Sequence, residues 1–200
     1  MKKLVLVTLV SVLCLSAAQA TIYPLEVFTN NGDYNDDPGL NFYMDVFNGG
    51  NTAKFKFYND STVQSSITNI YFDDGTLLGS TLSIDNGPGT LFAEGGPANI
   101  PSGNMIGFNA DREFNVGSEA PMLPQNGVNN TPAGEWVTIE FALVNGTLAD
   151  ILNELADGRL KVGIHVQDFS DGSSESAVNI PEPATLALLG LGGLLIRRRK

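Results

Sequence analysis

Three stretches of this 200-residue chain alternate apolar and polar residues with a period of two. They cover residues 53–58, 136–143 and 160–167. Neighbouring side chains of a β-strand point to opposite faces of the sheet, so this alternation predicts strands with one buried and one solvated face. The chain must then bury several such faces against one another, which favours an all-β architecture.

Other strands are indicated by short apolar runs between clusters of Gly, Asn, Asp and Ser. With the alternating stretches they give about nine strands, as expected of an all-β, two-sheet β-sandwich with jelly-roll-like connections. The further candidates are Ile22–Thr29, Leu40–Asn48, Ile67–Phe72, Leu77–Ile84, Ile106–Ala110 and Ser174–Asn179. One short helix is also expected, because Thr147 can cap its start and Gly158 can end it. Its apolar residues at helical spacing are Leu148, Ile151, Leu152 and Leu155.

The N-terminus has the parts of a secretory signal. A basic start precedes an apolar run over residues 4–15, and Ala18 and Ala20 form a small-x-small cleavage site. We therefore predict a signal peptide at 1–20 and export through the Sec translocon. Cys14 lies inside this segment, so the exported domain is expected to contain no cysteine.

The C-terminus has three parts in a fixed order. An apolar run over residues 184–196 lies between a Pro-Glu-Pro turn and a basic cluster. The turn is Pro181, Glu182 and Pro183, and the cluster is Arg197, Arg198, Arg199 and Lys200. We predict a transmembrane helix over 184–196 with the basic cluster on the cytoplasmic side. Such a helix is only about 20 Å long, against a hydrocarbon core of roughly 30 Å, which suits a transient anchor.

This tail resembles the PEP-CTERM sorting signal. The resemblance implies processing by exosortase, a membrane-embedded cysteine protease of Gram-negative bacteria that make extracellular polysaccharide. It implies a cut near the Pro-Glu-Pro turn at the inner membrane, after which the rest of the chain moves to the outer surface or the extracellular matrix. The predicted organisation is a signal peptide (1–20), a β-sandwich passenger domain (21–179) and a sorting signal (180–200). Residues 67–75 and 158–179 are similar to passenger domains of such proteins, a resemblance that implies no activity.

The passenger domain is acidic, and this excludes some classes of function. It keeps five of the 11 Lys and Arg residues and 21 of the 22 Asp and Glu residues once both end segments are removed, so its formal net charge is −16. A nucleic-acid binder would carry a basic surface instead, so we expect no nucleic-acid partner. One His and one Cys in the whole chain leave little material for a His-ligated metal or a cysteine zinc site.

We predict that the passenger domain is not an enzyme. A nucleophilic triad uses a His as its base, and His165 falls on the polar face of a strand, where we expect it to face solvent. A glycosidase needs two carboxylates across a cleft. Glu135 and Glu140 have an odd spacing in a strand and should point to opposite faces.

Oxygen ligands alternate in an Asn- and Gly-rich stretch near the N-terminus of the domain. Asp33, Asn35 and Asp37 could direct their side chains to one calcium ion, a hard cation that prefers oxygen. Pro38 and Met44 stand where an EF-hand loop requires Gly and Glu, so an Asx turn is the competing interpretation. Calcium is the one cofactor that the sequence suggests.

Trp136 is a candidate platform for a sugar ring. It lies on the face opposite Val137, Ile139 and Phe141. If that face is solvated, the indole ring could stack on a glycan. The competing interpretation is that the helix near 148–156 or an adjoining loop covers it.

Together these features predict an exported cell-surface or extracellular-matrix protein that an exosortase sorts through an inner-membrane intermediate. We expect a non-catalytic passenger domain associated with exopolysaccharide or biofilm, so extracellular polysaccharide is the expected partner after export. The alternative is a carbohydrate-binding module with a specific glycan ligand. A secreted glycosidase is a less favoured alternative.

Overall fold

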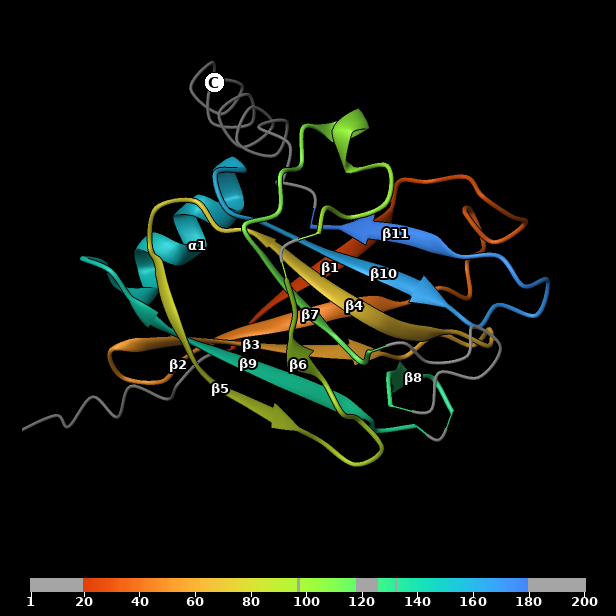
Figure 1. The fold of residues 1–200 in the computed structure, drawn as a ribbon, viewed down its shortest axis with the longest axis horizontal. Helices are drawn as coiled ribbons and strands as arrows, with labels where there is room; N and C mark the ends of the chain where they lie inside the picture. The colour runs from red at the N-terminus through yellow and green to blue at the C-terminus, as the bar shows by residue number, and fades with distance from the viewer. Residues whose placement is uncertain (1–19, 97, 118–125, 132, 180–200) are drawn as a thin grey trace, which may run out of the picture.

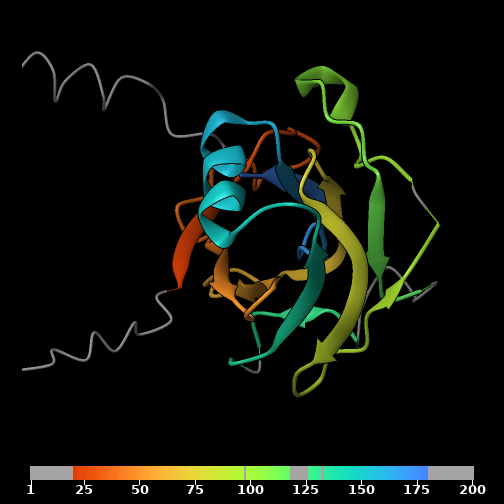
Figure 2. The ribbon, with the colours of Figure 1, turned by 90° about the vertical axis from the view of Figure 1, so that its left-hand side faces the viewer.

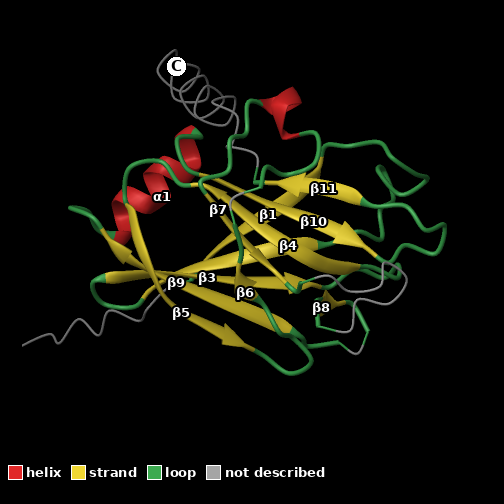
Figure 3. Cartoon of the chain, in the orientation of Figure 1, coloured by secondary structure: helices red, strands yellow, loops and turns green. Residues whose placement is uncertain are grey.

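The computed structural model describes residues 20–96, 98–117, 126–131 and 133–179, and these form a mostly β domain with one α-helix (Figures 1 and 3). The elements in chain order are β1 (Thr21–Val27), β2 (Phe42–Asn48), β3 (Thr52–Asn59), β4 (Ser66–Asp73), β5 (Leu78–Asn86), β6 (Ala93–Glu94), the 3₁₀ turn η1 (Gly103–Ile106), β7 (Arg112–Asn115), β8 (Val128–Asn129), β9 (Trp136–Leu143), α1 (Leu148–Asp157), β10 (Lys161–Gln167) and β11 (Glu175–Val178).

Most strands lie where the sequence predicts them. The three alternating stretches become β3, β9 and β10, and their apolar residues are buried. The prediction of a strand at Ile106–Ala110 was wrong. Ile106 ends η1, and the chain turns at Gly107 with a φ of +61° before β7 begins at Arg112. The run is apolar because Phe108 packs on the outside of the sheet, not because it forms a strand.

The strands form one continuous sheet, where the sequence predicted two. The order is β5-β9-β3-β2-β1-β11-β10-β4-β7-β6, with β8 paired to β4. β1 joins the two halves because residues 21–25 pair with β2, whereas Glu26 and Val27 pair with β11. The sheet curls into a nearly closed, barrel-like form (Figure 2). Its end strands meet through a hydrogen bond of 3.1 Å from Thr81 Oγ1 to Glu94 Oε1. The all-β class is confirmed, and the separate sheets and jelly-roll connections are not.

Aromatic rings fill the interior. Phe72 on β4 meets four other rings edge to face, with centroid distances of 5.2 Å to Phe55, 6.2 Å to Phe57, 5.8 Å to Phe114 and 4.9 Å to Phe141. All five side chains are fully buried. Three of them come from β3 and β9 and two from β4 and β7, so these contacts hold the two halves of the sheet together.

The helix α1 confirms the predicted helix and its ends. The carboxylate of Asp150 accepts hydrogen bonds from the N–H and the hydroxyl of Thr147, at 2.9 and 2.7 Å. These bonds lower the pKa of Asp150. Gly158 ends the helix with a φ of +76°. Ile151 and Leu155 are fully buried in the main core, so α1 packs onto the interior of the barrel.

A second, smaller apolar cluster lies on the outer face of β4, β10 and β11. Ile100 and Phe108, from the loop before β7, pack there with Tyr71 and Val178. Gly163 makes room for them, since a Cβ at this position would lie 2.7 Å from Ile100 Cδ1. The loop that carries η1 is therefore held against the sheet where β11 ends.

His165 lies on the polar face of β10, as predicted, but it is half-buried there and not open to solvent. Asn69 and Ser176 are its partners on the two neighbouring strands. Its Nδ1 atom is buried and has no hydrogen-bond partner in the described part of the chain. Burial lowers the pKa of His165, although the nearby Glu175 acts in the opposite direction.

Replacing Phe72 by Ala should destabilise the domain severely. The substitution removes the ring shared by four aromatic contacts, and such truncations cost about 3–5 kcal/mol. Urea unfolding followed by fluorescence measures the change. Ile22→Ala is the control, because Ile22 is 65% exposed and should change the stability by about 0.5 kcal/mol or less. Similar losses for both variants would contradict the role given to Phe72.

His165 should make the stability depend on pH in the range that begins at about 6.5, the ordinary pKa of a histidine, and extends downward. Its pKa is lower in the folded state than in the unfolded chain, so at acidic pH the unfolded chain binds more protons. The free energy of unfolding should therefore fall as the pH drops through this window. Urea titrations at several pH values should show a flatter dependence for His165→Gln. An unchanged dependence would show that other groups cause it.

Candidate functional site

The residues predicted to take part in sorting lie at or beyond the ends of the described chain. Ala20 is the first described residue and is exposed, and Asn179 is the last. The others fall outside the described residues: Ala18, Pro181, Glu182, Pro183, Arg197, Arg198, Arg199 and Lys200, together with the predicted transmembrane helix 184–196. Within the described ranges, no helix has the length and apolarity needed to cross a bilayer.

Asn179, the last described residue, is held firmly in the fold. This residue is 2% exposed. Its N–H donates to the Val162 carbonyl at 3.0 Å, and its Oδ1 accepts the Val162 N–H at 2.6 Å. The preceding strand, β11, pairs with β1 on one side and β10 on the other, so the chain leaves from an interior strand. Pro181 therefore follows only two positions after a residue fixed in the sheet.

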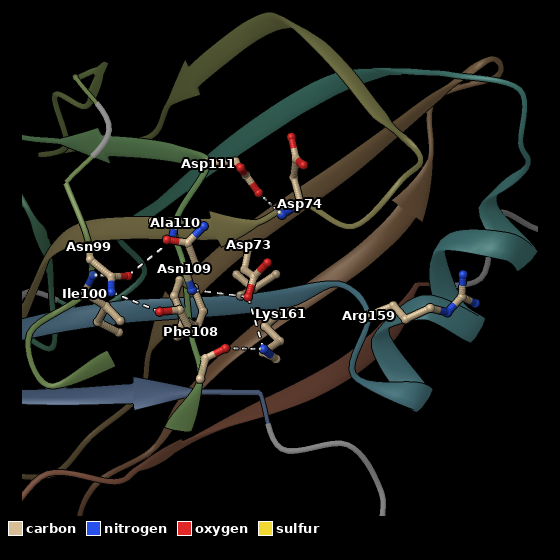
Figure 4. Close-up of polar contacts among 12 residues, drawn as sticks. Asp73, Asp74, Asn99, Ile100, Phe108, Asn109, Ala110, Asp111, Arg159 and Lys161 are labelled. Atoms are coloured by element: carbon tan, nitrogen blue, oxygen red, sulfur yellow. Dashed lines mark hydrogen bonds and ion pairs between the residues drawn. The ribbon is translucent and has the colours of Figure 1, made fainter. Parts of the chain in front are cut away.

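Polar contacts lie around the end of β11, where the described chain ends at Asn179 (Figure 4). Lys161 Nζ donates to Asp73 Oδ2 at 3.1 Å and to the Gly107 carbonyl at 2.7 Å. The N–H of Asn109 donates to the same Asp73 oxygen at 3.3 Å. Since Lys161 precedes Val162, the partner of Asn179, these contacts fix the η1 loop beside the end of β11.

Trp136 belongs to an aromatic row on the outer face of the sheet. It pairs with Tyr58 on β3, and Tyr58 pairs with Tyr43 on β2. The two tyrosine rings stack with centroids 4.8 Å apart. Three rings on adjacent strands span about 10 Å. All three residues are half-buried, so part of each remains accessible at the surface. The sequence points to Trp136 alone, because assembling the row requires the strand register.

The tyrosine hydroxyls of the row stay protonated at neutral pH. Burial, together with the carboxylates of Asp45 and Asp60, raises the pKa of Tyr58 to about 12. Burial and the hydrogen bond of 2.8 Å from the Tyr43 hydroxyl to Asp60 also raise the pKa of Tyr43. The row thus combines apolar ring faces with neutral hydroxyl groups, the combination that suits ligands with both apolar and polar faces.

A turn covers part of Trp136. The N–H of Gly87 donates to the Trp136 carbonyl at 2.9 Å, and a Cβ on Gly87 would lie 2.7 Å from the indole atoms Cδ2 and Cε2. The adjoining-loop interpretation is therefore correct in part. The helix α1 follows the other end of β9, about 23 Å of strand away from Trp136.

Lys56 lies over the aromatic row. Its Nζ is 4.0 Å from the Trp136 centroid and 5.0 Å from the Tyr58 centroid, within the range of cation–π attraction. The other four basic residues of the described chain form salt bridges, and Lys56 forms none with a described residue. They are Lys54, Arg112, Arg159 and Lys161. Among the described residues, Lys56 is thus a cation held by rings and not by a carboxylate.

The three predicted calcium ligands are not gathered around one point. Asn35 and Asp37 line a hollow beside β1, with Glu26 and Asp36. Asp37 Oδ1 accepts the N–H of Gly39 at 2.7 Å, which is the Asx turn of the competing interpretation. Asp33 is exposed and does not line the hollow. Among the described residues no three Asp, Glu, His or Cys side chains are grouped closely enough to hold a metal ion.

The start of this loop is held by Glu175, a residue that the sequence did not single out. Its carboxylate is fully buried and accepts hydrogen bonds from the Thr29 hydroxyl and from the N–H groups of Asn31 and Gly32, the latter two at 2.9 and 3.0 Å. Thr29 in turn accepts the N–H of Ser176 at 2.8 Å. Glu175 therefore has a structural role. The sequence did not indicate this role, because an acidic side chain is expected at the surface.

Comparison with known proteins identifies the tail and not the domain. The family model of the PEP-CTERM protein-sorting motif matches residues 179–200. No curated protein and no solved structure matches the chain. The match begins at Asn179, the residue at which the described fold ends. The chain therefore carries a PEP-CTERM protein-sorting motif, and this motif indicates an exported protein that an exosortase sorts.

Proposed function

We propose that the passenger domain is a non-catalytic surface or matrix protein that binds extracellular polysaccharide through the row of Trp136, Tyr58 and Tyr43. The observation that carries this proposal is the register that sets three aromatic rings side by side on the outer face of the sheet. The Tyr43 and Tyr58 rings stack on each other, so the row offers its remaining aromatic surface to the apolar faces of sugars. The neutral tyrosine hydroxyls can exchange hydrogen bonds with sugar hydroxyls.

Lys56 extends this proposal to acidic sugars. The domain is strongly acidic as a whole, and long-range repulsion disfavours an anionic polymer. A lysine held over the rings and without a carboxylate partner among the described residues offers local compensation to a carboxylate of a uronic acid. The row therefore suits a polymer in which acidic units alternate with neutral ones.

Positions of the acid–base groups support a non-catalytic role. His165 is half-buried, with its Nδ1 atom shielded. Glu135 is buried and accepts both the N–H and the Nδ2–H of Asn129, at 2.8 and 2.9 Å. Glu140 lies on the outer face in an ion pair of 3.5 Å with Lys54. Each carboxylate thus has a structural partner, and the two do not face each other across a cleft.

Before it reaches the surface, the exported chain is proposed to pass through an inner-membrane intermediate. Residues 184–196 would hold it in the bilayer until the cut near Pro181-Glu182-Pro183. The apolar length, the following basic cluster and the family match support this step.

Polysaccharide binding should depend on the aromatic row. Trp136→Ala and Tyr58→Ala should each weaken binding to the producing organism's own polysaccharide by about tenfold, the effect of losing roughly 1.4 kcal/mol of contact. Affinity electrophoresis of the purified domain in gels that contain the polymer measures the change. The control is Met105→Ala, because Met105 is 78% exposed and lies outside the row. Binding that survives both row variants would overturn the proposal.

Sorting should depend on the Pro-Glu-Pro turn. Replacing Pro181, Glu182 and Pro183 by Ala should leave the uncut chain in the inner membrane, because the extended, proline-fixed peptide that the protease grips is lost. Cell fractionation and immunoblotting follow the two forms. Unchanged release of the cut domain would show that the turn is not needed.

A further inference from the structure

We propose that the tip of η1, formed by Met105 and Ile106, touches the lipid of the inner membrane while the tail is inserted. The inference rests on the proposed membrane intermediate. It concerns a different surface of the domain from the aromatic row, and it assigns a contact to described residues that the sorting signal does not contain.

The tip is apolar and exposed. Met105 is 78% exposed and Ile106 is 37% exposed. Positive φ angles of +63° at Ser102 and +61° at Gly107 reverse the chain on either side, so the turn projects away from the sheet (Figure 1). A positive φ is unfavourable for a serine. The loop thus contains a strained backbone at Ser102 and leaves the large apolar side chains of Met105 and Ile106 exposed to water.

The tip lies beside the point where the chain leaves the fold. Gly107 follows the tip directly. Its carbonyl oxygen accepts a hydrogen bond of 2.7 Å from the Lys161 ammonium group. Val162, the next residue after Lys161, is the backbone partner of Asn179. Phe108 packs against Val178 at the end of β11. Figures 1 and 4 show the η1 loop and the end of β11 at the same end of the domain.

The connection to the membrane segment is short. Only residues 180–183 separate Asn179 from the apolar run. Four residues span at most about 14 Å when fully extended. The headgroup layer on each side of the hydrocarbon core is about 5–8 Å thick. While residues 184–196 are in the bilayer, the end of the domain that carries η1 is therefore held close to the lipid surface.

Charge at this end does not favour electrostatic binding to anionic lipid. Arg159 is paired with Glu154 at 2.7 Å and with Asp157 at 2.8 Å, and Lys161 is paired with Asp73. The contact should therefore be apolar and insensitive to salt. Two apolar side chains bind a bilayer weakly by themselves. The tail supplies a high effective concentration, so that weak partitioning suffices.

The test uses residues 21–200, which contain the described fold from Thr21 and the tail, reconstituted in phosphatidylethanolamine–phosphatidylglycerol vesicles. Since this form has no cysteine, Met105→Cys allows one environment-sensitive fluorophore to be attached at the tip. Leu91→Cys is the matched control. Leu91 is 61% exposed and lies in the connection between β5 and β6. Figures 1 and 2 show this connection at the end of the domain opposite to η1. Leu189→Cys reports on the tail.

Nitroxide-labelled lipid should quench the label at 105 several-fold more than the label at 91, and high salt should not change this. Adding Ile106→Asp should reduce quenching at 105 to the level at 91, because a carboxylate is costly in the membrane. Equal quenching at 105 and 91, with the tail label quenched, would overturn the contact alone. An unquenched tail label would overturn the membrane intermediate and the contact together. Quenching at 105 that requires added exosortase would assign the tip to the protease and overturn the lipid contact.

Discussion

The edge-to-face contacts around Phe72 are the interaction on which the rest of the structure depends. The described residues include no cysteine to cross-link them and carry many more acidic than basic side chains, so apolar burial must outweigh charge repulsion. One ring from β4 meets rings from β3, β7 and β9. These contacts draw the two halves of one sheet onto a shared interior, and the pairing of β1 with both β2 and β11 then becomes possible.

Local patterns predicted most of the elements but not the way in which they join. Alternation located β3, β9 and β10, and cap residues located α1, because both signals depend on nearby residues. The continuity of the sheet depends on β1, whose last two residues change partner. Nothing in their sequence distinguishes pairing with β11 from continued pairing with β2. The run Ile106–Ala110 was misassigned because Phe108 is buried outside the barrel, in a cluster that depends on Gly163, far along the chain.

The candidate sites also differ in how much of each could be predicted from the sequence. The sorting tail is contiguous, so its three parts could be recognised from the sequence and matched by a family model. The aromatic row is not contiguous, since Tyr43, Tyr58 and Trp136 meet only through the register of β2, β3 and β9. Trp136 could be placed on an outer face, but its neighbours and the covering turn at Gly87 could not. Alternating Asp and Asn residues suggested a calcium loop, whereas the buried Glu175 organises the start of that loop.

The place where the chain leaves the fold gives the domain two distinct ends. Asn179 is fixed in an interior strand, and the sorting motif follows almost at once, so an inserted tail would hold one end of the barrel near the bilayer. Trp136 begins β9 beside the Gly87 turn, which follows β5 at the end away from the exit (Figure 1). A polymer outside the membrane could then reach the row even before the tail is cut. Because only residues 180–183 separate Asn179 from the apolar run, the direction in which the row faces would follow from the fold while the tail is inserted.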